Sequence, residues 1–225
     1  MEAVIEGVTA QPDLVERLGR CYTGAVYDVL RERGLTRQVL PAGIAPLDPT
    51  STVAGVAFPI AGHVDEEASD HDTLLAWTRF LSRVPAGTVV VCQPNDHTSA
   101  HMGELSAEAL QQRGVHGYVV DGGCRDSSAV LARGFPVWCR YLTPRDIVGR
   151  WLCDAIDTTV EIGGVRVDPG DLMLADRDGV VVVPAAHAEE VVAAAGKAID
   201  TESAVRRAIR AGTDPDEAYR RHGRF

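Results

Sequence analysis

The sequence predicts a mixed α/β domain with a helical C-terminal tail, and two patterns along the chain predict it. Between residues 53 and 141, short apolar segments alternate with stretches of helical spacing, as in a parallel or mixed sheet covered by helices. After Thr158, apolar segments are separated by tight turns that contain glycine, which is typical of hairpins, although the longer connections could also be loops between sheets. No linker, internal repeat or low-complexity tract interrupts the 225 residues, so residues 1–225 are expected to form a single domain.

The individual elements follow from local signals. Proline is favoured in the first turn of a helix, so Pro12 is expected to begin one, and Gly34 is expected to end a second helix over about 23–33. Further helices are expected where apolar residues recur at helical spacing, at about 72–83, 99–113, 127–132 and 186–221. Strands are expected at short apolar runs, at 53–60, 89–92, 118–120, 137–141, 159–162, 165–167, 172–175 and 180–183.

Composition excludes several classes of protein. The formal net charge is −10 and the basic residues are scattered, so no nucleic-acid partner is expected. No apolar run is long enough to cross a bilayer, and the first residues are acidic, unlike a secretory signal. The chain is therefore expected to be cytoplasmic, with no membrane partner. The five cysteines form no C-x-x-C pair and are expected to be reduced thiols, mostly in the core: Cys21, Cys92, Cys124, Cys139 and Cys153.

Only one of the 22 basic residues is a lysine, Lys197. Schiff-base aldolases and pyridoxal-phosphate enzymes both need a lysine in the active site. Lys197 lies in the C-terminal helical stretch, far in sequence from the other candidate site residues. Covalent imine chemistry is therefore not expected, and an enzyme of this sequence that activates a carbonyl group would use a metal.

Two strand-to-helix junctions carry the candidate chemistry, at residues 95–106 and 121–126. Ligands of α/β sheets bind beyond the carboxyl ends of the strands, and neighbouring parallel strands would place two such junctions side by side. The residues expected to meet there, through side chains or backbone N–H groups, are Gly103, Glu104, Leu105, Ser106, Arg125 and Asp126.

These groups suit a small 2-oxo acid held beside a metal. A guanidinium binds a carboxylate or enolate oxygen by two parallel hydrogen bonds, and N–H groups at a helix start favour an anion. Two carboxylates with few other ligands suit Mg²⁺ or Mn²⁺, which keep several waters. Spacing alone leaves simpler interpretations open: Asp126 as the N-cap of the next helix, Glu104 as a carboxylate at a helix start, and Arg125 as half of a surface ion pair.

The same residues resemble the signature of a known family. Gly103-Glu104-Leu105, followed by residues 114–126 with Gly122-Gly123-Cys124-Arg125-Asp126, resembles the RraA-like family, which includes 4-hydroxy-4-methyl-2-oxoglutarate aldolases and regulators of ribonuclease activity A. The ordered set of motifs is specific and covers most of the chain. The likeness continues through residues 134–137, 163–171 and 175–184, and reaches back to Asp28 and 53–57.

The resemblance implies a layered β/β/α domain, similar to the swivelling phosphohistidine domain, with C-terminal helices. It also implies a class II aldolase that cleaves a 4-hydroxy-2-oxo acid, such as the dicarboxylate 4-hydroxy-4-methyl-2-oxoglutarate, to pyruvate, with oxaloacetate decarboxylation as a side activity. Asp126 would bind the Mg²⁺ or Mn²⁺, and Glu104 would position its waters. Arg125 would bind the pyruvyl group and stabilise the enolate, and the amides of Leu105 and Ser106 would receive the carboxylate.

The resemblance further implies a homotrimer or homohexamer. In the aldolase branch, an acidic residue from a neighbouring subunit's C-terminal helix completes the metal site, and Glu202 is the best match. On spacing alone, Glu202 could instead form an i,i+4 pair with Arg206. The rest of the substrate would be bound by loops and an adjacent subunit, with residues 63–72 as a candidate lid.

Two alternatives stay open. His97, His101 and Glu104 would share one face of a helix that starts early, and two histidines with a carboxylate can bind zinc in another lyase or hydrolase. The ribonuclease regulators keep the fold without the acidic metal site, so the second alternative is a non-catalytic regulator that binds a ribonuclease or another protein. The presence of both Glu104 and Asp126 favours the enzyme.

Overall fold

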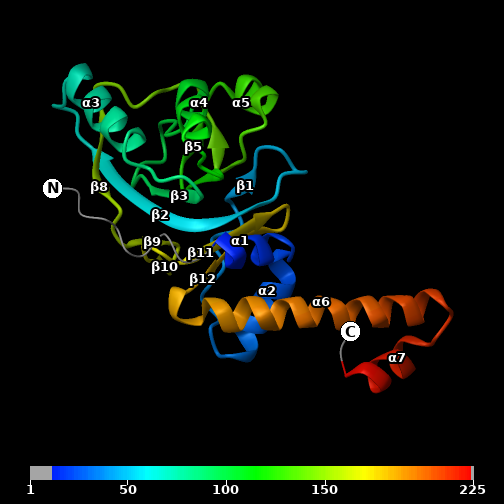
Figure 1. Ribbon diagram of the computed structural model, residues 1–225. Helices are drawn as coiled ribbons and strands as arrows, with labels where there is room; N and C mark the ends of the chain where they lie inside the picture. The colour runs from blue at the N-terminus through cyan, green and yellow to red at the C-terminus, as the bar shows by residue number, and fades with distance from the viewer. Residues whose placement is uncertain (1–11, 224–225) are drawn as a thin grey trace.

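The computed structural model describes residues 12–223, and its centre is an eight-stranded sheet (Figure 1). The strand order is β1-β6-β4-β3-β2-β11-β12, with β8 paired to the second half of β2. β2, β3, β4 and β6 run parallel, and the other strands are antiparallel to their neighbours. The strands of this sheet are β1 (Ala45–Pro46), β2 (Val53–Val64), β3 (Thr88–Gln93), β4 (Gly117–Val120), β6 (Val137–Cys139), β8 (Trp151–Ile156), β11 (Leu172–Asp176) and β12 (Gly179–Val183). Two separate pairs are β5 (Gly123–Cys124) with β7 (Tyr141–Leu142), and β9 (Val160–Ile162) with β10 (Val165–Val167).

The long strand β2 curls the sheet around a central core. Its start pairs with β11, its middle with β3 and its end with β8, and a register shift between Ala61 and Gly62 interrupts the pairing with β8. A Cβ atom at Gly62 would overlap the Leu152 carbonyl oxygen and the Trp151 ring, so this crossing requires glycine. At the other edge, residues 38–40 hydrogen-bond to β12, and β1 pairs with β6. The sheet is therefore a nearly closed barrel.

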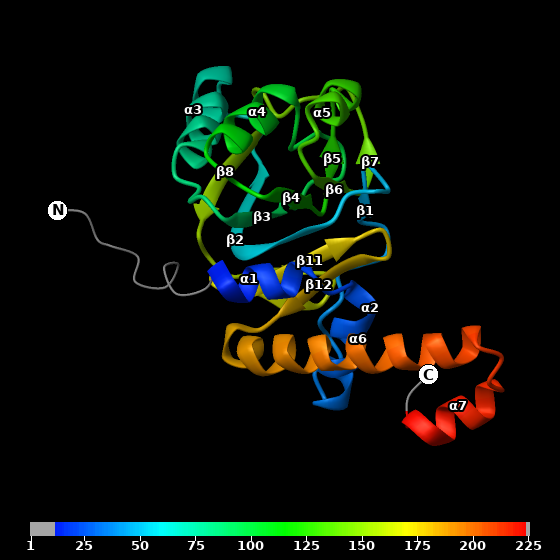
Figure 2. The same cartoon turned by 45° about the vertical axis from the view of Figure 1, so that its right-hand side comes forward.

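Helices cover the two outer surfaces of the curled sheet (Figures 1 and 2). Three of them, α3, α4 and α5, pack on the parallel strands, while α1, α2 and α6 pack on β11 and β12. The inside of the curl is filled by apolar side chains from both parts of the sheet, including Val91, Trp138 and Met173. The helices are α1 (Pro12–Gly19), α2 (Thr23–Glu32), α3 (Asp70–Leu81), α4 (Glu104–Gln112), α5 (Ser127–Arg133), α6 (Ala188–Arg210) and α7 (Pro215–His222), with a 3-10 turn, η1 (Ala185–His187), before α6.

The predicted mixed α/β fold with C-terminal helices is confirmed. The Gly163-Gly164 turn closes the β9–β10 hairpin, and the turn containing Asp178 closes the β11–β12 hairpin, as predicted. The longer connection at residues 168–170 is a loop between sheets, since it joins the small β9–β10 sheet to the main sheet. The predicted strand at 137–141 is divided into β6 and β7, which belong to different sheets. β8 was missed by the sequence analysis.

Two predictions from composition can be compared with the structure. All five cysteines are free and buried, as expected for reduced thiols in a core. Within residues 12–223, no helix has both the length and the apolar character that crossing a membrane requires.

Candidate functional site

The two predicted junctions lie side by side at the carboxyl ends of β3 and β4. These strands are parallel neighbours, and the loops that follow them are joined by a bridge between Ala100 and Gly123. The N–H of His101 donates to the Gly123 carbonyl oxygen at 2.9 Å, and the N–H of Arg125 donates to the Met102 carbonyl oxygen at 2.9 Å. This backbone ladder fixes the first junction against the second.

The helix predicted from residue 99 begins at Glu104 instead. The Asp96 carboxylate accepts hydrogen bonds from the N–H groups of Thr98 and Ser99, which holds residues 96–99 in a turn. Such local side-chain bonds compete with helix formation. Because Ala100 to Met102 are buried against the second junction, tertiary contacts override the helical spacing.

Asp126 occupies the N-cap position of α5, as the simpler interpretation expects, but its side chain does not cap the helix. It precedes α5 with left-handed angles (φ 53°, ψ 32°) and makes no side-chain cap hydrogen bond. Its Oδ2 instead accepts from the N–H of Glu104 and from Nε of Arg125, both at 3.3 Å. A non-glycine residue in this region costs about 1–3 kcal/mol, and such strain clusters at functional sites.

Gly103 makes this approach possible. A Cβ atom at this position would lie 2.8 Å from Asp126 Oδ2 and 3.2 Å from Arg125 Cγ. The backbone of Gly103 is extended (φ −153°), so glycine is needed for space and not for its conformation. The start of α4 therefore touches the Arg125-Asp126 pair directly.

Arg125 is bonded between two carboxylates. Besides its Nε bond to Asp126, its Nη1 donates to Asp146 Oδ2 at 3.1 Å, and its side chain keeps 37% of its exposure. Asp146 was not foreseen, because it lies 21 residues downstream of Arg125 in an irregular segment without a recognisable motif. Arg125 is held in place from both sides while part of it faces solvent.

The N-terminus of α4 offers donors. The first N–H groups of a helix have no intrahelical acceptor. Among residues 12–223, those of Leu105 and Ser106 have no hydrogen-bond partner, whereas that of Ala107 already bonds to Gly103. The Ser106 hydroxyl accepts from Nε1 of Trp77 at 2.9 Å, which ties α3 to α4. Two free N–H groups and the helix dipole favour a carboxylate here.

Glu104 lies in the same cleft, but its carboxylate is directed toward α5. Its Oε1 is 3.6 Å from Nη2 of Arg133, which also contacts Glu108 at 3.0 Å. Only the backbone N–H of Glu104 contacts Asp126. The two carboxylates therefore share one cleft without touching each other.

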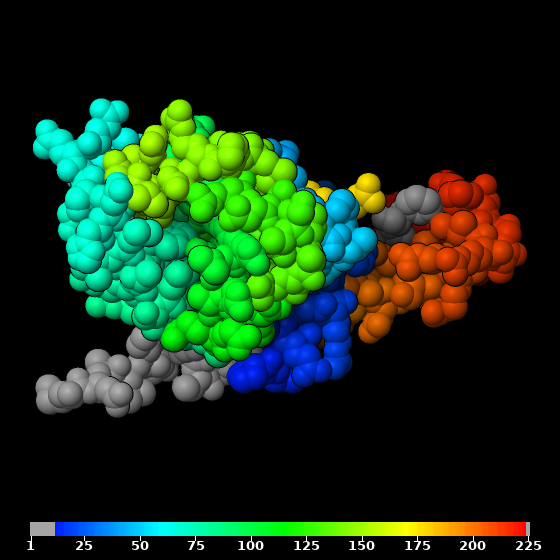
Figure 3. Space-filling model, turned by 90° about the horizontal axis from the view of Figure 1, so that it is seen from above, coloured from blue at the N-terminus to red at the C-terminus, as the bar shows by residue number. Residues whose placement is uncertain are grey.

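A cleft of 560 Å³ joins these groups, with α3 and the segment after β7 as its other walls. It opens on the face seen in Figure 3, where teal α3, the green region of α4 and α5, and the yellow-green segment around residue 146 come together. All six residues predicted for the junctions line this cleft. Gly103 has no side chain and lines it with its backbone. The lining residues are Leu74, Trp77, Thr78, Leu81, Ala100, His101, Met102, Gly103, Glu104, Leu105, Ser106, Arg125, Asp126, Asp146, Ile147 and Val148.

The donors in this cleft fit a hydrated Mg²⁺ or Mn²⁺ better than zinc. Within residues 12–223, no three side chains of His, Cys, Asp or Glu are arranged to hold a metal ion. The cleft offers two carboxylates near the N-terminus of α4, those of Glu104 and Asp126. The backbone of Asp126 is in the αL region, and its side chain does not cap a helix. A cation that keeps several waters needs no more than one or two carboxylates from the protein.

The zinc alternative loses its geometric basis. Since α4 begins at Glu104, His97 and His101 do not share a helical face with it. His97 is exposed, whereas His101 is buried, with its ring centroid 4.9 Å from that of Trp151. His101 Nε2 lies 3.3 Å from Asp96 Oδ2 without making a hydrogen bond, and burial lowers the pKa of His101 to about 4. His101 is therefore a neutral core residue.

Two further predicted features lie away from the cleft. Glu202 is on α6, across the sheet from α3, α4 and α5 (Figures 1 and 2), where the Tyr22 hydroxyl donates to its carboxylate. Residues 63–72 comprise the end of β2, a short loop and the start of α3, and none of them lines the cleft. The lid role of 63–72 stays a prediction, since the wall that α3 contributes begins at Leu74.

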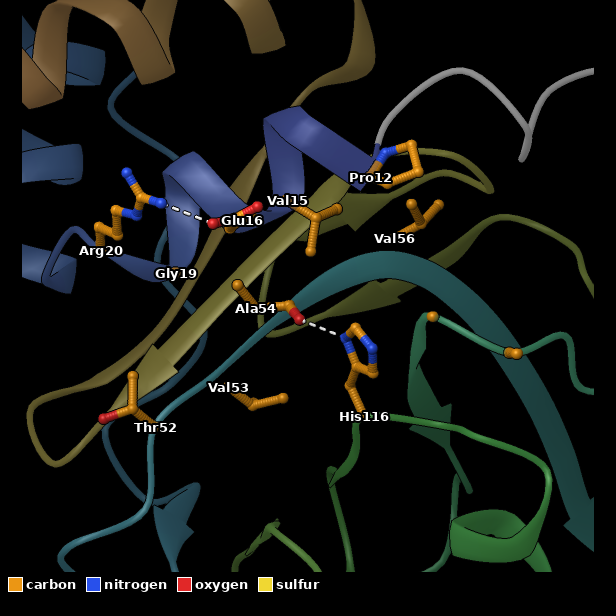
Figure 4. Close-up of a pocket in the computed structure, with 12 residues that line it drawn as sticks. Pro12, Val15, Glu16, Gly19, Arg20, Thr52, Val53, Ala54, Val56 and His116 are labelled. Atoms are coloured by element: carbon orange, nitrogen blue, oxygen red, sulfur yellow. Dashed lines mark hydrogen bonds and ion pairs between the residues drawn. The ribbon is translucent and has the colours of Figure 1, made fainter.

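A second hollow, of 600 Å³, lies between α1 and the start of β2 (Figure 4). Its ionisable side chains include the Glu16–Arg20 ion pair and His116, whose Nδ1 is 2.8 Å from the Ala54 carbonyl oxygen. It lies at the amino ends of the parallel strands and contains none of the predicted site residues. Ligands of such sheets bind at the opposite ends, which favours the Arg125-Asp126 cleft.

Comparisons with known proteins identify the family of the chain. The sequence model of the RraA-like family, described as Aldolase/RraA, matches residues 23–182, a range that includes both junctions and Asp146. A protein of Halalkalibacterium halodurans, provisionally named 4-hydroxy-4-methyl-2-oxoglutarate aldolase, is 30% identical over 204 residues, which are 89% of this chain and 90% of that protein.

Two solved structures are similar over most of their length. One is RraAS2 of Streptomyces coelicolor, described as an unusual member of the RNase ES inhibitor RraA protein family. It is 32% identical, with a TM-score of 0.79 over 88% of this chain and 98% of that one. The other is an uncharacterized protein of Pseudomonas syringae pv. tomato, 27% identical, with a TM-score of 0.83 over 92% of this chain and 97% of that one.

Proposed function

Because the chain belongs to the RraA-like family, we propose that it is a divalent-metal-dependent carbon–carbon lyase that releases pyruvate from a 4-hydroxy-2-oxo acid. The observation that carries this proposal is the position of the Arg125-Asp126 pair. The Asp126 carboxylate accepts from the N–H of Glu104 at the N-terminus of α4 and from Nε of Arg125, and all three residues line one open cleft. An anionic 2-oxo acid and a cation can both be bound there.

Substrate binding follows from the donors of the cleft. The carboxylate of the 2-oxo acid accepts from the N–H groups of Leu105 and Ser106, at the positive end of α4. The Arg125 guanidinium, positioned by Asp126 and Asp146, donates to the oxygen on C2. Since that oxygen gains charge as the C–C bond breaks, Arg125 binds the transition state more strongly than the substrate.

The metal would be held by Asp126, with Glu104 positioning its waters. When bound, Mg²⁺ or Mn²⁺ acts as a Lewis acid that polarises the C2 carbonyl group of the substrate. Glu104 would have to exchange its contact with Arg133 for this role, and the 3.6 Å separation of that pair makes the exchange inexpensive.

The reaction is a retro-aldol cleavage. A nearby water takes the proton of the C4 hydroxyl group, the C3–C4 bond breaks, and its electron pair forms the enolate of pyruvate while C4 leaves as a carbonyl group. Protonation at C3 then gives pyruvate. Oxaloacetate reaches the same enolate by losing CO₂, so decarboxylation of oxaloacetate is the expected side activity, and both reactions depend on Arg125.

A pyruvate assay coupled to lactate dehydrogenase tests the proposal, with 4-hydroxy-4-methyl-2-oxoglutarate and oxaloacetate as substrates. Activity is expected to disappear with EDTA, to return with Mg²⁺ or Mn²⁺, and to be lost in Asp126→Asn, since asparagine keeps the size and tolerates the αL conformation. Asp178→Asn, an exposed change in the β11–β12 turn, is the matched control. Activity that survives both chelation and Asp126→Asn would reject the metal-dependent mechanism.

We also propose that the protein acts as a homotrimer or homohexamer in which Glu202 of a second copy completes the metal site. Within one chain Glu202 lies across the sheet from the cleft, so only a neighbouring copy could bring it there. Glu202→Gln and Asp126→Asn should each be inactive alone, and mixed oligomers of the two should regain activity. If mixing restores nothing, or light scattering finds a monomer, the shared site is excluded.

A second candidate function is regulation of a ribonuclease. The similarity to RraAS2 of Streptomyces coelicolor, described as a member of an RNase inhibitor family, supports it. A complete lack of pyruvate formation with all metals, together with inhibition of a purified ribonuclease, would favour this function over the lyase.

A further inference from the structure

The hydroxyl group of Ser106 has one hydrogen-bond partner, and that partner is a donor. Nε1 of Trp77, on α3, donates to Ser106 Oγ at 2.9 Å. A serine hydroxyl can accept two hydrogen bonds and can also donate one of its own. Within the part of the chain that the structure describes, Ser106 Oγ donates to no acceptor. The contact with Trp77 therefore uses the accepting side of the hydroxyl group and leaves its O–H available as a donor.

Trp77 is fixed by its packing, so it can orient this hydroxyl group. It is 7% exposed, and its ring centroid lies 4.9 Å from that of Phe80 and 6.0 Å from that of Trp151. An indole N–H is a donor only, so in this position it always occupies a lone pair of Ser106 Oγ. The hydroxyl hydrogen is therefore directed away from Trp77.

The other two tryptophans differ in the group that they bond. Nε1 of Trp138 donates to the Asp176 carbonyl oxygen at 2.9 Å, and Nε1 of Trp151 donates to the Pro94 carbonyl oxygen at 2.7 Å. Both of these bonds end on the backbone. Of the three tryptophans, Trp77 alone donates to a side chain, and that side chain lines the cleft.

Ser106 lies in the first turn of α4, where the N–H groups proposed to receive the substrate carboxylate are also found. Its own N–H and that of Leu105 are those two donors, so a third donor comes from the same residue. The two oxygens of a carboxylate have about four lone-pair sites between them, enough for all three donors. The Trp77–Ser106 bond lies within one chain, so the arrangement does not depend on a second copy.

We propose that the Ser106 hydroxyl group donates a third hydrogen bond to the substrate carboxylate, and that Trp77 is a positioning residue that keeps this hydroxyl group in its donating orientation. The inference rests on the proposed pyruvate lyase activity of the same cleft. It adds a side chain to a carboxylate site so far built from backbone N–H groups, and it gives α3 a part in substrate binding.

The hydroxyl group acts on binding and not on the bond-breaking step. The carboxylate carries the same charge in the 2-oxo acid and in the enolate, so a hydrogen bond to it stabilises both states equally. Loss of such a bond weakens binding and leaves the rate at saturation unchanged. Arg125 differs, because it is proposed to contact the oxygen that gains charge, and its loss lowers kcat.

The test measures pyruvate binding and enolate formation separately, both with Mg²⁺. Isothermal titration calorimetry gives the Kd of pyruvate, and NMR follows exchange of its methyl protons in D₂O. Ser106→Ala is expected to raise Kd about tenfold, the effect of losing one hydrogen bond to a charged group, with little change in the exchange rate at saturation. Ser106→Thr keeps the hydroxyl group and should restore most of the affinity. Ser128→Ala, an exposed serine in the first turn of α5 outside the cleft, is the matched control and should bind like wild type.

A double-mutant cycle tests the role of Trp77. Trp77→Phe removes the indole N–H and keeps an aromatic ring in the wall. It should weaken pyruvate binding in the wild-type background and have no further effect in Ser106→Ala, because its influence passes through that hydroxyl group. Equal effects of Trp77→Phe in both backgrounds would show that Trp77 acts through packing alone and would overturn its positioning role.

A spectroscopic measurement on the wild-type protein tests the same role without a substitution at Trp77. A hydroxyl group that donates becomes a stronger acceptor, so the indole N–H signal of Trp77 should move downfield in the NMR spectrum when pyruvate binds. The indole signals of Trp138 and Trp151, which bond to the backbone, should stay in place. A Trp77 signal that stays in place as pyruvate binds would contradict the inference.

The outcomes separate the inference from the proposed function. Equal Kd values for wild type and Ser106→Ala, with exchange intact, would overturn the role of the hydroxyl group and leave the lyase standing. Pyruvate that binds without exchange would overturn the lyase, while the two Kd values would still decide the role of Ser106. Absence of pyruvate binding to the wild-type protein would overturn both.

Discussion

Gly103→Ala is the substitution that separates the geometry of the cleft from the stability of the fold. The new Cβ atom would lie 2.8 Å from Asp126 Oδ2 and 3.2 Å from Arg125 Cγ, both closer than ordinary contacts. These two atoms belong to side chains that keep 44% and 37% of their exposure, so they can move away. The extended backbone of residue 103 accepts alanine without strain.

The magnitudes follow from that displacement. The free energy of unfolding should change by less than about 1 kcal/mol, because no core atom moves. A shift of the Asp126 carboxylate and the Arg125 side chain by a large fraction of an ångström should lower kcat/KM by about 10- to 100-fold, since misplacement of about 1 Å can cost 10²-fold. That loss corresponds to about 1.4–2.7 kcal/mol in the transition state.

The measurement combines the coupled pyruvate assay with a thermal or urea melt of the same preparation. Gly196→Ala is the control, because it lies within α6 and a Cβ there would have no heavy atom within 4 Å. Full activity in Gly103→Ala, or an equal loss in Gly196→Ala, would refute the claim that contact between α4 and the Arg125-Asp126 pair is catalytically important.

Three further predictions concern charge, pH and the sheet crossing. Arg125→Ala should lower kcat by about 10²–10³, the effect of losing one oxyanion donor. The melting temperature should change little, because both ion pairs of Arg125 are partly exposed. A large fall in melting temperature would instead assign Arg125 a structural role. The pKa of His101 is near 6.5 in the unfolded chain, and burial lowers it to about 4 in the folded protein. As the pH falls, the unfolded state therefore protonates His101 at a higher pH than the folded state does. Stability should therefore fall by up to about 3 kcal/mol as the pH drops from about 6.5 to 4, and urea titrations of His101→Gln should show a shallower dependence over that window. Gly62→Ala should lose more than about 3 kcal/mol, since its Cβ would overlap backbone, and a folded variant of wild-type stability would disprove the steric argument.

The sequence predicts the central sheet because its strands carry strong local signals. β2, β3, β4, β11 and β12 are nearly continuous runs of buried apolar residues between turns, so length and flanking glycines identify them. β8 is harder to detect, since its burial is irregular and it contains the exposed Asp154. Its pairing with the second half of β2 depends on the bend at Gly62, a tertiary feature.

The candidate site is predictable where it depends on neighbouring strands. Parallel β3 and β4 bring the two junctions together, as the order of elements requires. Local sequence patterns do not predict the long-range contacts of the cleft. Asp146 meets Arg125 through a loop, and Trp77 meets Ser106 through the packing of α3 on α4. The early start predicted for α4 was wrong for the same reason, because residues 100–102 are held by the opposite junction.

A crystal structure with Mg²⁺ and oxalate, a planar anion that resembles the enolate of pyruvate, measures the central claim most directly. The expected result is the cation on Asp126 and the oxalate between Arg125 and the N–H groups of Leu105 and Ser106. Oxalate bound in the hollow beside His116, or density for neither molecule near Asp126 at saturating concentrations, would contradict the assignment of this cleft.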